Sequence, residues 1–263
     1  MQSLSHAIRD ALLTPDPRAK CFATRALVRE WRRGELAPVF DTYMPDRPAW
    51  PETLELLPPS QMPRRGKGGS EKSRIALWHA LAHIEFVAID LALDMVGRFG
   101  AQGGQEFADD FLQVAAEEAM HFGLIERKLR SLGSHYGALP VHDGLWQAAQ
   151  DTAHDVAARL AVVPMVLEAR GLDVTPAMLE RVRAAGDENG AKILARILDD
   201  EITHVRFGTK HFLIQAKVRR IPPVELWHTL VNQHFTGRIQ PPFNDSARFA
   251  AGLSRDFYCG IAS

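Results

Sequence analysis

The chain has 263 residues, of which 46% are hydrophobic and 24% charged, so it is long enough for one large domain with an apolar core and too apolar for a disordered chain. The formal net charge of −1 argues against the one-signed surface of a protein that follows nucleic-acid phosphates or an anionic membrane. The two cysteines, Cys21 and Cys259, have neither the number nor the spacing of a disulfide framework or a thiolate metal site, which favours a reduced, cytoplasmic location.

The beginning of the chain does not have the pattern of a targeting segment. His6, Arg9 and Asp10 interrupt its apolar residues, and no later run reaches about 18 apolar residues. We therefore expect no membrane association, in agreement with a cytoplasmic protein.

The first 69 residues are predicted to form an N-terminal helix followed by a wrapping arm. Amphipathic spacing predicts the helix over residues 18–32, and six prolines between Pro45 and Pro63 predict an extended segment after it. Residues 64–69 are basic and glycine-rich, a composition more typical of a solvated loop than of a phosphate site, since no Walker pattern is present.

Two long helices are predicted next. Ser70 is a suitable N-cap for a helix that continues to Phe99, and the glycines of residues 100–104 predict a turn. A second helix is expected over residues 105–132, where Gly133 is a natural stop, followed by a crossover to Gly144.

A third helix is predicted from Asp143 to about Arg170. Pro164 should kink it one turn before Glu168, because proline removes a backbone donor. A separate short helix is expected to begin at Thr175-Pro176 and to end near Ala185.

A fourth long helix is predicted over residues 189–219, stopped by Pro222-Pro223. No segment has the sustained alternation of a β-strand, so the predicted class is all-α. The order of two helix pairs with a longer crossover predicts a ferritin-like four-helix bundle over residues 70–220, with residues 221–263 as a helical tail packed on it.

Six residues on these helices form the ligand set of a di-metal site. Such sites take one Glu from each of two helices and a Glu-x-x-His pair from each of the other two. The sequence supplies this set in full: Glu85, Glu118, His121, Glu168, Glu201 and His204.

The spacing of this set is duplicated. Glu118 follows Glu85 by 33 residues, and Glu201 follows Glu168 by the same interval. Residues three apart share one helix face, so a carboxylate and an imidazole can reach a common metal. Carboxylate oxygens with one imidazole per metal favour iron or manganese, and we expect two iron ions.

Further polar residues near the motifs are less strongly indicated as part of the metal site. Glu117 and Asp200 each precede a motif, and we expect Asp200 to support His121 and Glu117 to support His204 from outside the metal, although plain solvent-facing charge is an equal alternative. Helical phase directs His83 away from Glu85, so neither it nor His79 is expected to bind metal. Five apolar residues near the ligands are expected to be core more than a substrate pocket: Trp78, Phe86, Met120, Phe122 and Phe207.

With this set in place, residues 70–220 resemble the di-iron carboxylate proteins. The segments His79–Glu85, Val166–Asp173 and Pro241–Asn244 also resemble an uncharacterised bacterial ferritin-like family, known as a domain of unknown function. The resemblance implies a ferritin-like bundle with a di-metal site and distant kinship with di-iron hydroxylases that act on modified adenosine in tRNA. It implies no substrate. In this sequence Glu168 lies close to Gly171, near the predicted end of its helix, whereas comparable ligands usually lie in mid-helix.

The leading functional interpretation is an oxygen-activating di-iron oxidoreductase of the hydroxylase type, with a small-molecule or modified-nucleotide substrate, a separate electron-donating reductase, and a homodimer as the favoured assembly. One alternative is a ferritin-like protein that binds or oxidises ferrous iron without an organic substrate. Another is a metal-free interaction protein, in which the glutamates are ordinary exposed charges and the two histidines belong to the core.

Overall fold

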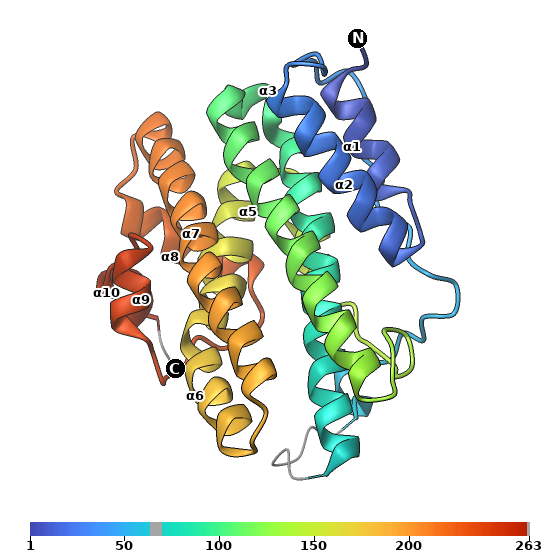
Figure 1. Cartoon of the computed structure of the whole chain (residues 1–263). Coiled ribbons are helices and arrows are strands. Elements are labelled where there is room, and N and C mark those ends of the chain that lie inside the picture. Colours follow the sequence, from blue (N-terminus) through green and yellow to red (C-terminus); the bar gives the residue numbers. More distant parts are fainter. Residues whose placement is uncertain (64–69, 262–263) are drawn as a thin grey trace. The chain divides into compact units, whose positions relative to one another are not determined.

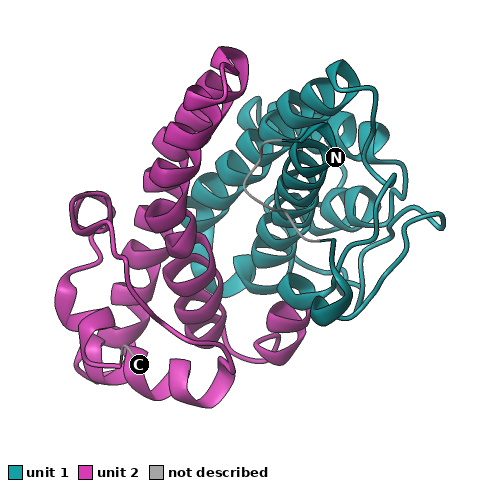
Figure 2. Ribbon diagram, turned by 90° about the horizontal axis from the view of Figure 1, so that it is seen from below, with its two compact units in different colours: residues 1–146 teal, residues 147–263 magenta. Residues whose placement is uncertain are grey.

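The computed structural model of the chain describes residues 1–63 and 70–261, and every regular element within these ranges is a helix. The basic, glycine-rich stretch of residues 64–69, interpreted above as a solvated loop, lies outside the described residues. The chain forms two compact units, unit 1 of residues 1–146 and unit 2 of residues 147–263 (Figure 2). The all-α class predicted from the sequence is confirmed for the described residues.

Unit 1 begins with two short amphipathic helices, α1 and α2. The regular elements of this unit, up to the crossover, are α1 (Leu4–Leu12), α2 (Pro17–Arg32), the short 3₁₀ helix η1 (Pro59–Gln61) and α3 (Glu71–Ser131) (Figure 1). The prediction of a helix over residues 18–32 is confirmed by α2, which the side chain of Asp16 caps. The sequence analysis missed α1, although Leu4, Ile8 and Leu12 form a fully buried stripe at helical spacing.

The long helix α3 is a hairpin of the two helices predicted from the sequence. It starts at Ser70 with a capping box to Ser73, leaves helical geometry at Gly104, where φ is +78°, and ends before Gly133. The two halves pack side by side, since the ring centroids of Phe86 and Phe122 are 5.4 Å apart. Only Gly104 makes the turn, so the reversal is tighter than the five-residue glycine turn predicted.

Two of the helical glycines next to that turn receive side chains of the proline-rich segment. A Cβ atom added at Gly97 would overlap the side chain of Met44, and one added at Gly100 would overlap the ring of Phe40. Glycine at these positions therefore lets the segment before η1 lie against the first half of α3.

We expect Gly100→Ala to lower the free energy of unfolding by about 1–3 kcal/mol, because the ring of Phe40 must move from a packed position. Gly123→Ala is the matched control in the same helix, since nothing lies within 4 Å of its added Cβ atom. That change should raise stability by about 0.5–1 kcal/mol through helix propensity alone. Urea unfolding of both variants measures the two effects, and a stabilised Gly100→Ala variant would contradict the packing role.

A buried ion pair joins α2 to α3 in the core of unit 1. The ammonium Nζ of Lys20 lies 2.6 Å from Asp90 Oδ1, and both side chains are fully buried. Lys20 also donates to the carbonyl oxygen of Ala49, and Trp50 Nε1 donates to Asp90 Oδ2 over 2.9 Å. These contacts fasten the proline-rich segment to the two helices on which it lies.

The boundary between the units, after Trp146, falls within the helix α4 (Gly144–Asp151). The helices that follow in unit 2 are α5 (Val156–Val162), the π-helical turn η2 (Val163–Glu168), α6 (Ala169–Ala184), α7 (Glu188–Arg219), α8 (Pro223–His234), α9 (Asp245–Ala250) and α10 (Arg255–Cys259). The predicted fourth helix over residues 189–219 is confirmed by α7, which ends at Arg220 in a left-handed conformation.

The third helix differs from its prediction at both ends. It begins at Val156, after an Asp155 cap, and not at Asp143, whose neighbourhood starts the separate helix α4. It does not end near Arg170: α5, η2 and α6 form one continuous helical path to Ala184, so the predicted separate helix from Thr175 is wrong. Gly171 leaves helical geometry undisturbed here, because glycine permits a helix end but does not impose one.

The expected disturbance at Pro164 takes the form of a π-helical turn. Proline lacks the N–H that an α-helix needs, and a wider turn is one way to accommodate the missing bond. Gly208 of α7 provides the space for its ring, because a Cβ atom there would overlap Pro164. The π turn therefore packs closely on α7, and Glu168 is its last residue.

Among the described residues, α3 is the one helix long and apolar enough to cross a membrane, with an 18-residue window of mean hydropathy 1.5. Within the protein, 72% of that window is buried. This is the usual property of the core helix of a soluble domain.

Candidate metal centre

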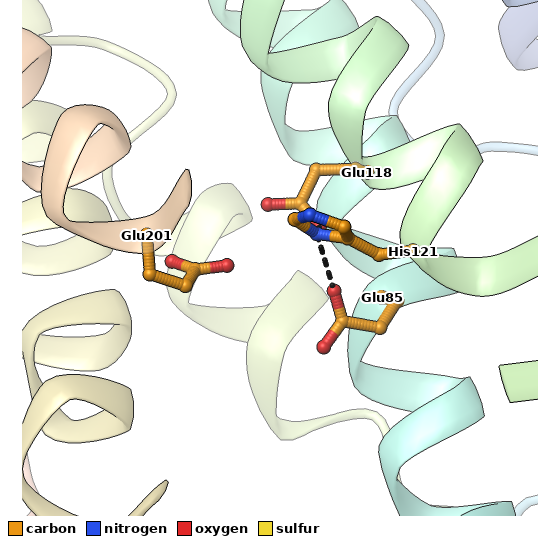
Figure 3. Close-up of side chains that lie close together, drawn as sticks. All are labelled: Glu85, Glu118, His121 and Glu201. Atoms are coloured by element: carbon orange, nitrogen blue, oxygen red, sulfur yellow. Dashed lines mark hydrogen bonds and ion pairs between the residues drawn. The ribbon is translucent and has the colours of Figure 1, made fainter. Parts of the chain in front are cut away.

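Three of the six predicted ligands meet inside unit 1. Glu85 lies on the first half of α3, and Glu118 and His121 lie on the second half. Their ligand atoms are all within 4.8 Å of one another. The Nδ1 atom of His121 is 3.2 Å from Glu85 Oε2 and 3.3 Å from Glu118 Oε2. Figure 3 draws these side chains and marks the contact between His121 and Glu85. The fourth side chain drawn there, Glu201, belongs to unit 2 and is described with that unit below.

The hairpin at Gly104 brings these ligands together. Glu118 and His121 share a helix face because they are three residues apart, and the reversal of the chain places Glu85 opposite them. The residues that directly follow two of the ligands, Phe86 and Phe122, contact each other and are buried. Packing of apolar neighbours on both halves therefore sets the position of the polar cluster.

The cluster is buried and strongly interacting. Glu85 is 5% exposed, Glu118 1% and His121 0%. Burial raises the pKa of Glu85 well above its ordinary value, and the charge of Glu118 adds to the rise. Burial by itself would lower the pKa of His121, but its contacts with Glu118 and Glu85 outweigh this effect and raise the pKa to about 11.

Two carboxylates this close in a buried site repel each other unless positive charge lies between them. In the metal-free protein the raised pKa values of His121 and Glu85 both favour a bound proton, and a proton on either group relieves this repulsion. A metal ion can replace the proton, because the same imidazole nitrogen and carboxylate oxygens are ligand atoms once deprotonated. The donors fit a metal: this is a buried Glu and His cluster able to bind one, and its oxygen-rich composition suits iron or manganese better than a thiolate-seeking ion.

Unit 2 contains the second Glu-x-x-His pair, on α7. The Nδ1 atom of His204 lies 3.6 Å from Glu201 Oε1, and the imidazole is fully buried while the carboxylate side chain is 13% exposed. The pair has the same three-residue spacing as Glu118 and His121 in unit 1 and brings the same imidazole nitrogen near a glutamate oxygen, over 3.6 Å here and 3.3 Å there. The duplication seen in the sequence is thus repeated in the local geometry of the two pairs.

Glu168 ends the π-helical turn η2, which packs on α7, the helix that carries Glu201 and His204. The sequence analysis placed Glu168 near the end of its helix, and the structure corrects this: helical backbone continues for another 16 residues as α6. Glu168 is therefore a mid-helix residue. Its departure from the pattern of the resembling proteins was a consequence of the wrong helix boundary.

The acids that precede the two motifs make contacts on their own helices. Glu117 accepts a hydrogen bond from Gln113 Nε2 over 3.1 Å, and Asp200 pairs with Arg196 Nε at 2.6 Å. Both are partly buried. Their expected support of His204 and His121 remains a prediction.

His79 and His83 hold the loop that follows α3. His79 Nε2 accepts from the backbone N–H groups of Gly137 and Leu139, and His83 bonds the hydroxyl of Tyr136 at 2.9 Å and the carbonyl of His142 at 3.0 Å. Burial lowers the pKa of each imidazole to about 4, so both are neutral near pH 7. No spacing in the sequence indicated these loop contacts, because the partners are backbone groups and a tyrosine far along the chain.

Among the five apolar residues considered near the ligands, Trp78, Phe86 and Phe122 are buried, and Met120 and Phe207 are partly buried. Their packing agrees with the core role favoured by the sequence analysis.

The described residues thus define an all-helical protein with a buried carboxylate and imidazole cluster able to bind a metal. The family described as "Protein of unknown function (DUF455)" matches residues 13–259, and the chain belongs to this family. An uncharacterized protein of Haemophilus influenzae is 36% identical in an alignment that covers 94% of this chain and 90% of that protein. No solved structure matches the chain.

Proposed function

We propose that Glu85, Glu118, His121, Glu168, Glu201 and His204 together hold two iron ions and that the protein is a di-iron carboxylate oxidoreductase. The single observation that carries this proposal is the duplicated pair: a buried imidazole Nδ1 lies beside a glutamate oxygen three residues earlier on both α3 and α7. A chance cluster of buried acids has no reason to repeat in this form. Manganese fits the same ligands, and supply in the cell decides between the two.

The proposal includes a ferritin-like four-helix bundle. In that fold two helices each give one Glu, and two others each give a Glu-x-x-His pair. The chain offers one of each kind within unit 1, on the two halves of α3. It offers another of each kind within unit 2, on η2 and α7. The resemblance described in the sequence analysis supports the same fold.

For activity we propose oxygen-dependent hydroxylation or a related oxidation of an organic substrate, with electrons from a separate reductase. When bound, an iron pair supplies the redox and oxygen chemistry that side chains lack. The residues of this chain would neutralise the metal charge with four carboxylates and orient two imidazoles toward it, and buried aromatic rings such as Phe86 and Phe122 would exclude water. Glu117 and Asp200 are proposed to tune the imidazoles from outside the metal. The buried cluster supports a metal-dependent role over that of a metal-free interaction protein.

Elemental analysis and electronic spectroscopy of protein purified from iron-supplemented cells test this function. We expect about two iron ions per chain and an absorption spectrum typical of an iron pair. Zinc alone, or no metal with an unchanged melting temperature on addition of ferrous iron, would contradict the proposal. Rapid oxidation of added ferrous iron with ferric iron accumulating on the protein would favour the iron-handling alternative over an organic substrate.

A further inference from the structure

The solvent-facing side of α2 carries a row of cationic and aromatic residues. Its members recur at helical spacing and are all exposed: Arg18, Phe22, Arg25, Arg29 and Arg32. Successive residues of a helix are rotated by about 100°, so these side chains leave the helix within an arc of about 80°. The buried residues of α2, which include Leu27 and Val28, lie on the opposite side. We call this row the arginine face.

The arginine face contains no acidic residue. The acid within α2, Glu30, is rotated by about 120° from the middle of the face. Several exposed arginines on other helices have an acid one turn away: Arg130 with Glu126, Arg183 with Glu180, and Arg196 with Asp200. On α2, Arg25 is instead one turn from Arg29, and like charges at this spacing destabilise a helix. A bound polyanion would remove this repulsion.

The length of the arginine face suits a chain of phosphates. The formal net charge of −1 averages over the whole chain and does not describe this face. From Arg18 to Arg32 the face is about 21 Å long, since a helix rises about 1.5 Å per residue. One nucleic-acid strand has a phosphate about every 3.4 Å along its axis, so a strand laid along α2 would present about six phosphates to the arginines.

The exposed ring of Phe22 is an independent observation that points to the same ligand. Phe22 is 59% exposed in the middle of the arginine face, and the guanidinium of Arg18 lies 5.5 Å from the centroid of its ring. Water solvates exposed cations well, but it gives no advantage to a large exposed apolar ring. Bases of a single strand stack on such rings whatever their sequence, and an adjacent arginine strengthens the contact.

Other anionic partners fit the arginine face less well. Binding to an anionic membrane surface requires an apolar stripe that enters the lipid, and Phe22 is the one apolar residue of this face. An acidic protein segment would pair with the arginines, but it has no flat rings to place on Phe22. A strand with unpaired bases uses both the charge and the aromatic ring.

We propose that the arginine face of α2 binds single-stranded nucleic acid, with the guanidinium groups on its phosphates and the ring of Phe22 stacked on a base. Electrostatic attraction supplies most of the affinity. Stacking on Phe22 favours an unpaired strand over a duplex, whose bases are already stacked on each other. The binding uses neither a metal nor a predicted metal ligand, so it is independent of the proposed di-iron function.

The probe is a fluorescein-labelled RNA of about twelve uridines, the size of a typical single-strand site. Its fluorescence anisotropy is followed while full-length protein treated with chelator is added. We expect a dissociation constant of about 1–100 µM at about 50 mM salt. With four arginine–phosphate contacts, the logarithm of the association constant should fall with that of the salt concentration with a slope of about −3. A thymidine DNA of the same length should bind about equally, because both strands offer phosphates and bases.

Arg25→Gln together with Arg29→Gln should weaken RNA binding about tenfold and reduce the steepness of the salt dependence by about 1.4, since two of the four contacts are lost. The matched control is Arg181→Gln with Arg183→Gln, which removes two exposed arginines from α6. It should change the affinity less than about twofold, because salt screens charges far from the bound strand. Removal of the repulsion between Arg25 and Arg29 should leave the melting temperature of the first variant unchanged or higher.

Phe22→Ala should weaken RNA binding about fivefold or more with an unchanged salt dependence, because it removes stacking and no charge. Phe249→Ala, which removes an exposed ring from α9, should have no effect. Absence of RNA binding, equal losses in the two arginine variants, or a Phe22→Ala variant that binds like the unaltered protein would each overturn the proposal. Binding to vesicles of phosphatidylcholine and phosphatidylglycerol without binding to RNA, or release of RNA by polyglutamate as readily as by unlabelled RNA, would overturn it in favour of a membrane or an acidic protein.

Discussion

Replacing Glu118 and Glu201 together by alanine is expected to reduce the metal content from about two ions per chain to near zero while the helices remain intact. Each substitution removes the carboxylate next to a ligand histidine, leaving His121 or His204 without its partner on the same helix face. Loss of folding is not expected, because removal of Glu118 also removes its repulsion with Glu85 in the metal-free protein. Iron analysis and far-ultraviolet circular dichroism measure the two properties separately.

The matched control for this variant is Glu106→Ala with Glu225→Ala, which also removes two glutamates but takes them from exposed positions, one in each unit. It should keep the metal content of the unaltered protein. Retained binding of two metals by the Glu118 and Glu201 variant would refute the assignment of the ligands. A loss of helix content in that variant alone would assign these glutamates a structural role in place of the metal role.

Removing the carboxylate of Asp90 is expected to lower the free energy of unfolding by about 3–5 kcal/mol. The variant Asp90→Ala leaves the ammonium of Lys20 fully buried, with the carbonyl oxygen of Ala49 as its remaining hydrogen-bond partner among those described for it. A buried cation without a counter-ion is far more costly than the loss of an exposed pair. Guanidinium unfolding of the metal-free protein gives the value directly.

The double variant Lys20→Met with Asp90→Leu should recover part of that loss, since two apolar side chains replace two desolvated charges while Trp50 Nε1 still lacks the acceptor that Asp90 gave it. Glu180→Ala, which breaks the exposed pair with Arg183, should cost less than about 1 kcal/mol. If the double variant were as unstable as Asp90→Ala, the cost would lie in lost packing and in the lost hydrogen bond from Trp50, and not in an unpaired buried charge.

The helix hairpin of unit 1 was predictable because its signals are local. Ser70 provides a cap, the apolar residues keep helical spacing, and Gly104 permits the positive φ that reverses the chain. The grouping of Glu85 with Glu118 and His121 follows from two such local features, the hairpin and the three-residue spacing. Their proximity in the structure therefore agrees with the reasoning from sequence, while their role as metal ligands stays a prediction.

The helix around Glu168 was predicted wrongly because glycine and proline are ambiguous signals. Gly171 and Pro176 are both compatible with a helix end, yet the packing of α6 on α7 keeps both within one helix. A proline in the first turn of a predicted helix looks the same as a proline in mid-helix when neighbouring contacts are unknown. The π turn has the same origin, since the space that Gly208 leaves for Pro164 is a tertiary feature.

Contacts between residues far apart in the chain could not be predicted from the sequence either. Two sets of contacts join residues more than 50 positions apart in the chain. His79 and His83 bind the loop around Tyr136, and Arg170 binds the carbonyl oxygen of Pro242. No periodicity encodes such pairings. A single sequence shows that these residues are polar or unusual in type, but not which groups they bind.

The π-helical turn from Val163 to Glu168 makes the length of this segment as important as its composition. Successive residues of a helix are rotated by about 100°, so loss of one residue here would leave the chain helical while every side chain after it faced a different direction. The wider turn lies between α5 and α6, so its length sets the direction of the faces of α6 relative to those of α5. A homologue shortened by one residue before Glu168 would still contain this glutamate, but its side chain would point in a different direction.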